Sequence, residues 1–269
     1  MKSLWTATLL MTFFASGSAF ARSSSVFGSE DRYMITNGQG VSSPSFLDGL
    51  HGSNPAGLIY NTSIKVEAAG ATFDDSTNDI KGSGALLAGN SLIAVGAEYS
   101  QFNTEPLPKG TDQLNFGLAG RLSTLNTTFG VSGHAVSNGG GTDFDAGTLI
   151  DLFPRLTFGA MVKDFTHGIH ELGAGFNFTA DSMVDFVVDA AYQIDEKEVT
   201  VKPGLTLHTD LIQASAAYGF KVTKNTADDS FLSRDFSVGV GLKLTQNILI
   251  EYQYKVFPQH WVGLTLRGN

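Results

Sequence analysis

The chain has 269 residues, no cysteine, and a formal net charge of −9, with 26 acidic against 17 basic side chains. This acidic balance argues against nucleic-acid binding, which requires a basic surface, and the absence of cysteine excludes a disulfide-stabilised scaffold. Only 16% of residues are charged, although the chain contains 20 Phe and 31 Gly. Such a composition is typical of proteins in which apolar and polar side chains alternate and average out.

The first 21 residues have the three parts of a secretory signal peptide in order. Lys2 supplies a positive start, residues 4–15 are largely apolar, and Ala19-Phe20-Ala21 forms a small-x-small exit. The apolar part is shorter than the roughly 20 residues that span a bilayer, and no later stretch reaches about 18 apolar residues. The alternative is a buried N-terminal helix. We expect residues 1–21 to be a signal peptide, which places the mature chain outside the cytoplasm.

Residues 22–62 differ in composition from the rest of the chain. They are rich in Ser, Gly and Asn and show no strand-like alternation. The sequence Gly49-Leu50-His51-Gly52-Ser53-Asn54-Pro55-Ala56-Gly57-Leu58 lies near their end. In isolation, Asn54-Pro55 predicts a turn, because the residue before a proline is restricted to extended or turn geometry.

From residue 63 onward, segments of about 10 residues alternate between apolar and polar side chains, the pattern of transmembrane β-strands. In one segment, Phe236, Val238, Val240 and Leu242 share a face, while Lys243 lies on the opposite one. A helix would instead distribute the charges around its surface. The pattern predicts about fourteen strands. They cover residues 63–73, 79–88, 91–102, 112–123, 126–136, 142–153, 155–165, 168–179, 182–193, 197–208, 210–222, 231–244, 247–257 and 259–268.

The predicted connections also alternate in length. Links after even-numbered strands are tight, such as Gly89-Asn90 and Thr245-Gln246, whereas several links after odd-numbered strands are longer, such as residues 103–111. Bacterial outer-membrane barrels have short periplasmic turns and longer outer loops. The sequence therefore predicts an all-β protein, a closed antiparallel transmembrane barrel with an even number of strands over residues 63–269. The rival interpretation is a soluble β-sandwich, whose strands also alternate.

The motif Asn54-Pro55-Ala56, which follows an exported N-terminus and precedes the first strand, resembles the long-chain fatty-acid transporter family of the outer membrane (FadL-type). Members of that family are fourteen-stranded barrels with an N-terminal plug. The resemblance implies that residues 22–62 form a plug inside or beneath the barrel. It also implies passage of fatty-acid-like molecules.

Strand parity places ionisable side chains of both signs on the lumen face. Because unpaired charges are costly in a narrow lumen, many of them should pair or meet water. One interpretation is a salt-bridged, plugged interior, and the other is a polar conduit whose charges set selectivity. The candidates for the second interpretation are Glu98, Arg121, Glu171, Asp185, Glu251 and Lys255.

Catalytic and metal sites are weakly indicated. There is no Gly-x-Ser-x-Gly elbow, and Ser132 with His134 on one strand face is too little for a hydrolase. His167, His170 and Asp164 could bind a metal but are better explained by a solvated turn. We expect no enzyme activity, no cofactor and no metal.

The sequence thus predicts a monomeric barrel of the bacterial outer membrane, in contact with lipid, that passes small hydrophobic or amphipathic molecules. The alternative is a structural or surface-interaction barrel without transport. A general diffusion porin would require a long loop folded into the lumen, which the sequence does not contain.

Overall fold

A computed structural model describes residues 54–60, 64–73, 80–102, 111–137, 141–166, 168–180, 183–195, 197–222, 236–255 and 259–268. The predicted signal peptide and most of the predicted plug segment lie outside these residues. No helix in the described ranges is long and apolar enough to cross a membrane.

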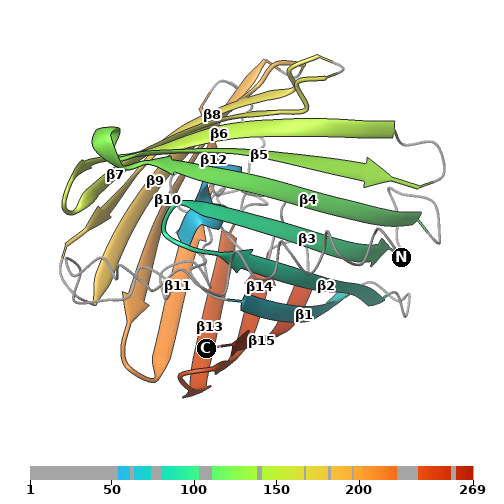
Figure 1. The fold of residues 1–269 in the computed structure, drawn as a ribbon, viewed down its shortest axis with the longest axis vertical. Helices are drawn as coiled ribbons and strands as arrows, with labels where there is room; N and C mark the ends of the chain where they lie inside the picture. The colour runs from blue at the N-terminus through green and yellow to red at the C-terminus, as the bar shows by residue number, and fades with distance from the viewer. Residues whose placement is uncertain are drawn as a thin grey trace, which may run out of the picture.

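The described residues form a short 3₁₀ helix followed by a large antiparallel sheet (Figure 1). The elements are η2 (Pro55–Tyr60), β1 (Ile64–Phe73), β2 (Ile80–Gly89), β3 (Ile93–Phe102), β4 (Thr111–Leu122), η3 (Ser123–Leu125), β5 (Thr127–Val136), β6 (Gly141–Phe153), β7 (Leu156–Lys163), β8 (Glu171–Thr179), β9 (Val184–Gln193), β10 (Glu198–His208), β11 (Ile212–Tyr218), β12 (Phe220–Lys221), β13 (Phe236–Thr245), β14 (Ile248–Lys255) and β15 (Gln259–Gly268).

The sheet closes on itself. β1 pairs with β15 along its whole length, from Ile64 opposite Gly268 to Phe73 opposite Gln259, and β11 pairs with both β10 and β13. Closure pairs the backbone groups of each strand with both neighbours, as a barrel wall in lipid requires. With β11 and β12 counted as one interrupted strand, the described residues form a closed barrel of fourteen antiparallel strands, which confirms the predicted fold class.

The interruption between β11 and β12 corrects the prediction of one continuous strand over residues 210–222. β12 pairs with Thr200 and Val201 of β10, and β11 pairs with β10 from Gly204 onward. At the break, Lys202 and Pro203 of β10 have no ladder partner in β11 or β12. Because proline has no N–H to donate to a ladder, strand pairing is weakened at this point.

The two rims differ in their connections. On one rim, which we call the tight-turn rim, short links join β2 to β3, β4 to β5, β6 to β7, β8 to β9, β10 to β11 and β13 to β14. Asn90 shows how such a turn is held, because its side-chain Oδ1 accepts from the N–H groups of Leu92 and Ile93 at 2.8 and 2.9 Å. The opposite rim, the loop rim, carries the longer links. One of these links corrects the prediction for residues 168–179, because the loop after β7 continues to His170 and β8 begins only at Glu171.

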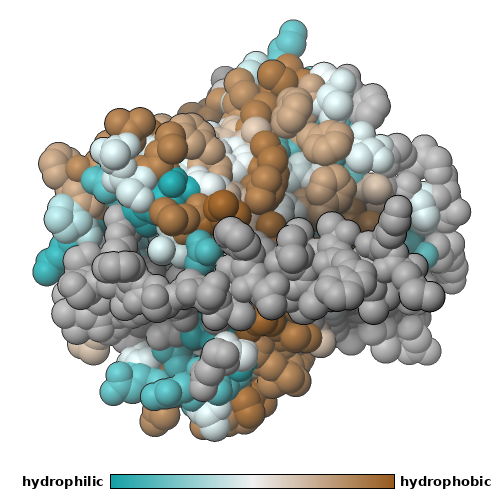
Figure 2. Space-filling model, viewed as in Figure 1, coloured by the Kyte–Doolittle hydropathy of each residue, from teal (hydrophilic) through white to brown (hydrophobic). Residues whose placement is uncertain are grey.

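Side-chain exposure alternates along the wall strands. In β8, Leu172, Phe176 and Phe178 are 45–48% exposed, whereas Gly175 and Asn177 between them are buried. Figure 2 shows large apolar side chains gathered over the outer wall on the face in view. In water, so extensive an apolar surface would drive association, whereas in a bilayer it is the lipid-facing surface that a barrel needs.

Candidate functional site: a segment inside the barrel

The short segment Asn54–Tyr60 lies within the ring of strands (Figure 1). Its helix η2 contacts β2, β3, β4, β5 and β6 on their inner side, and every residue of η2 is buried. It belongs to none of the sheet ladders. It is therefore a separate body packed against the inside of the wall.

The local sequence explains how this segment turns. Asn54 Oδ1 accepts from the Ala56 N–H at 3.1 Å, and the Asn54 carbonyl accepts from the Gly57 N–H at 2.9 Å. Pro55 between them fixes its own φ and has no N–H that needs a partner. Asn and Pro in this order therefore build a self-contained turn, as the sequence predicted for this pair.

The same asparagine fastens the turn to the wall. Its Nδ2 donates to the carbonyl of Thr148 on β6 at 3.1 Å and to the carbonyl of Ala160 on β7 at 3.2 Å. Asn54 is only 1% exposed. The oxygen of this buried carboxamide thus accepts a hydrogen bond within the turn, and its nitrogen bridges two adjacent wall strands.

Two wall glycines provide the space for this turn. A Cβ added to Gly130 of β5 would overlap the Pro55–Ala56 peptide, and a Cβ added to Gly147 of β6 would overlap the Asn54 carboxamide. The obstacle at Gly130 is backbone, which cannot rotate away. Glycine is therefore required at Gly130 for the close approach, not for an unusual backbone conformation.

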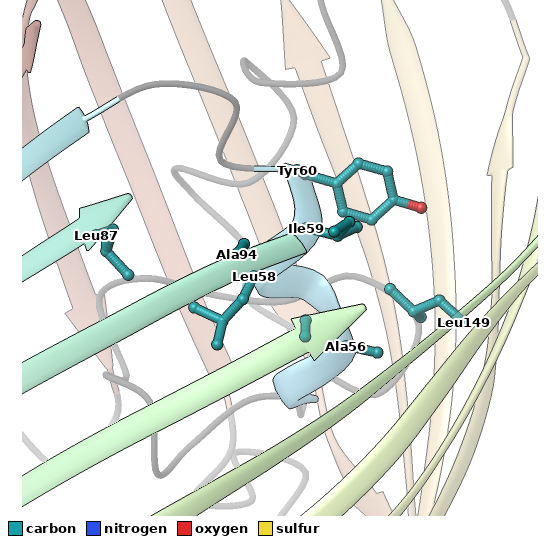
Figure 3. Close-up of a cluster of buried hydrophobic side chains, with 8 residues drawn as sticks. Ala56, Leu58, Ile59, Tyr60, Leu87, Ala94 and Leu149 are labelled. Carbon is teal, nitrogen blue, oxygen red and sulfur yellow. The ribbon is translucent and has the colours of Figure 1, made fainter. Parts of the chain in front are cut away.

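Apolar side chains complete the packing, as Figure 3 shows. Leu58, Ile59 and Tyr60 lie among buried wall residues that are unusual for a lumen face because they are apolar. These wall residues are Leu87, Ala94, Ala119 and Leu149. They come from strand ends near the tight-turn rim, so the segment packs against the inner wall in that part of the barrel.

Beyond this cluster, the inner wall is largely polar. Glu98 of β3 is 7% exposed and accepts from Asn115 Nδ2 of β4, its cross-strand neighbour, at 3.1 Å. Arg121 Nη2 lies 2.7 Å from Asp151 Oδ2, and Thr157 Oγ1 donates to the other oxygen of Asp151 at 3.0 Å. Two of the charged candidates, Glu98 and Arg121, therefore have polar partners on the wall.

The remaining charged candidates are distributed around the barrel. Glu171 pairs with Lys163 at 3.0 Å between β7 and β8. Asp185 of β9 and Glu251 of β14 are 4% and 3% exposed. The side chain of Lys255 lies outside the described residues. The structure thus brings Asn54, Pro55 and Ala56 together in one contact site. It does not gather the charged candidates whose side chains are described into one cluster.

Several residues of the site were not singled out from the sequence. Gly130 and Gly147 are two of 31 glycines, and no local pattern separates them from the others. The carbonyls of Thr148 and Ala160 are backbone groups and therefore carry no sequence signal. An indirect signal was present in Leu149, an apolar residue on the polar parity of its strand.

Comparison with known proteins agrees with this architecture. No protein-family model and no curated protein sequence matches the chain. Among solved structures, the chain is similar to the toluene transporter TbuX of Ralstonia pickettii, with a TM-score of 0.59 and 10% identity over 82% of this chain and 93% of that one. It is also similar to a mutant of the monoaromatic hydrocarbon channel TodX (TM-score 0.55, 10% identity, 89% and 97% covered).

The outer membrane protein Omp33 of Acinetobacter baumannii is a third match (TM-score 0.53, 11% identity, 77% and 98% covered). At these identities the likeness concerns the fold. The fold implied by the FadL-type resemblance is confirmed. The chain has the architecture of a bacterial outer-membrane barrel, with an apolar outer wall to match.

Proposed function

We propose that this barrel allows passive passage of small hydrophobic or amphipathic molecules across the outer membrane, with residues 22–62 acting as its plug after a signal peptide over residues 1–21 is removed. The observation that carries the proposal is the contact site of Asn54–Tyr60. This segment occupies the lumen yet is joined to the wall by side-chain hydrogen bonds and packing, without a sheet ladder. Such a body can shift without opening the wall.

The chemistry of the inner wall supports an amphipathic permeant. Near η2 the wall is apolar, with Leu87 and Leu149 each 1% exposed, and beyond it the wall carries hydrogen-bonded acids such as Glu98. A molecule with an apolar body and a polar end would meet complementary groups in both parts. Solved barrels of similar fold include a toluene transporter and a monoaromatic hydrocarbon channel, which agrees with this class of permeant.

Uptake by cells tests the proposal. The full chain is expressed in a bacterium whose own outer-membrane uptake of fatty acids has been deleted, and entry of a labelled long-chain fatty acid and of toluene is measured. We expect uptake with the wild-type chain and its loss when Asn54, Pro55 and Ala56 are replaced by Gly-Ser-Gly. The heat-dependent gel mobility of the folded barrel serves as the folding control. Unchanged uptake in a folded variant would remove the plug role.

The second candidate is a structural or surface-interaction barrel without transport. The ion pair between Arg121 and Asp151 favours it, because the pair joins β4 to β6 across β5 and stiffens the wall. Native mass spectrometry of the detergent-extracted protein separates the two. A bound fatty acid or hydrocarbon supports the channel. A protein that neither carries nor takes up such ligands supports the structural barrel.

A further inference from the structure

Three metal-ligating side chains converge near the loop rim, at the end of the barrel opposite η2. They are His134 of β5, Asp145 of β6 and Asp164, which directly follows β7. One ligand atom of each lies within 4.8 Å of the other two. His134 and Asp145 are 6% and 0% exposed. Donors from β5, from β6 and from the residue after β7 thus meet at the inner face of the wall, where the Asp164 side chain is 25% exposed.

The position of Asp164 depends on an unusual backbone conformation. By strand parity, Asp164 would follow Ala160 and Val162 on the outer face. Its φ of +55° instead lies in the left-handed region, which is uncommon for a residue other than glycine. The turned backbone lets the Asp164 N–H donate to Asp145 Oδ1 at 2.9 Å. The backbone thus turns the Asp164 carboxylate toward the inner-face residues His134 and Asp145.

The contact between His134 and Asp164 has the features of a ligand pair. Their Nε2 and Oδ1 atoms are 2.8 Å apart. In the described residues, this Asp164 oxygen is shielded from solvent and accepts no hydrogen bond. The imidazole nitrogen and the carboxylate oxygen therefore face each other at the inner wall, close enough for one cation to contact both once the pair opens slightly.

The surrounding charges favour a cation as well. Asp143 and Glu171 add negative charge at the same rim, and the nearby Lys163 is paired with Glu171 at 3.0 Å. Asp143 Oδ1 accepts from Thr166 Oγ1 at 2.7 Å, which holds the loop close to β6. Carboxylates therefore outnumber the basic groups of this corner, and a bound cation would offset the repulsion among them.

We propose that His134, Asp145 and Asp164 bind a divalent transition-metal ion of the Zn²⁺ type. One imidazole and two carboxylates suit Zn²⁺ better than Ca²⁺ or Mg²⁺, which prefer oxygen ligands alone. Zn²⁺ binds N and O ligands at about 2.0–2.2 Å, so a shared ion requires the 2.8 Å contact between His134 Nε2 and Asp164 Oδ1 to open slightly. The bound ion would tie the segment after β7 to β5 and β6. This proposed site differs from the sequence-based expectation of no metal, and it is independent of the permeation proposal.

Titration of the metal-free, full-length barrel in detergent with Zn²⁺ tests the site, with heat released as one readout and the visible absorption spectrum of Co²⁺ as a second. We expect one ion per chain. His134→Gln and Asp164→Asn should each weaken binding about tenfold or more, because each removes a direct ligand. Asp195→Asn, which removes an exposed carboxylate from the same rim, should bind as the wild type does.

Asp164 lies outside the strands, so Asp164→Asn should leave barrel folding intact even if His134→Gln does not fold. No stoichiometric binding of Zn²⁺ or Co²⁺ to the folded wild type would overturn the proposal and leave His134 and Asp164 as an ion pair only. Binding that survives Asp164→Asn, or that is lost in Asp195→Asn, would also overturn it.

Discussion

Near the tight-turn rim a backbone turn packs against wall glycines, whereas near the loop rim the inner wall carries a cluster of ionisable side chains. Asn54 and Gly130 represent the first region, where close packing between the turn and the wall excludes larger side chains. His134 and Asp164 represent the second region, where the contacts are between ionisable side chains. The first end holds η2 in place by packing, and the second gathers charged side chains.

The largest effect is expected from Gly130→Ala. The added Cβ overlaps the Pro55–Ala56 peptide, so η2 must move away from β5. We expect this to lower the free energy of unfolding by about 1–3 kcal/mol. Chymotrypsin cleavage after Tyr60, which is 7% exposed, should accelerate about ten- to hundredfold in the folded barrel. Gly120→Ala is the matched control, because its Cβ meets nothing nearer than the Leu92 carbonyl at 3.9 Å. Equal cleavage of the two variants would contradict the packing of η2 against Gly130.

A comparable loss of stability is expected from Asn54→Ala. The substitution leaves the carbonyls of Thr148 and Ala160 without this donor, at about 1–3 kcal/mol for each group that stays unsatisfied. Urea unfolding measures the difference. Asn54→Asp separates the two functions of the side chain, because it keeps the acceptor for the Ala56 N–H but has no donor for the wall. If Asn54→Asp is as stable as the wild type, the bonds to the wall contribute nothing.

Arg121→Gln tests the charged part of the wall. Arg121 and Asp151 are 2.7 Å apart with side chains 10% and 18% exposed, so the loss should remain below the about 3–5 kcal/mol of a fully buried pair. We expect about 2 kcal/mol in urea unfolding. Adding Asp151→Asn should recover part of this loss, because the remaining carboxylate is then neutralised. Strictly additive losses would show that the two side chains do not interact.

The smallest effect concerns pH at the loop rim. The hydrogen bond from His170 to Asp195, at 2.6 Å, raises the pKa of His170 above its usual value of about 6.5, and the Asp195 charge adds to this. Because the pKa is raised, the ion pair between His170 and Asp195 stabilises the loops below about pH 6.5. This stabilisation is lost as the pH rises through the pKa of His170 in the folded protein. Both side chains are exposed, so the gain is small. An NMR titration of His170 should show its pKa falling in Asp195→Asn, and an unchanged pKa would contradict the contact.

The wall could be predicted from the sequence because its determinants are local. Side chains such as Leu172 and Phe176 face lipid at every second position, and turn residues such as Asn90 mark the strand ends. The motif Asn54-Pro55-Ala56 could be identified for the same reason, since its turn is built from its own atoms.

The contacts inside the barrel could not be predicted because they depend on strands far apart in the sequence. Asn54 reaches carbonyls 94 and 106 residues away. Asp164 joins His134 only because its backbone leaves strand geometry, which parity cannot anticipate. The strand break beside Pro203 was not predicted, although a proline within a strand pattern signals weakened pairing.

Ion conductance of the purified barrel in planar bilayers tests the central claim most directly. If Asn54–Tyr60 obstructs the lumen, the wild-type barrel and Gly120→Ala should pass almost no current, and Gly130→Ala should conduct. Steady current through the wild type, or equally low current through a folded Gly130→Ala barrel, would contradict the account.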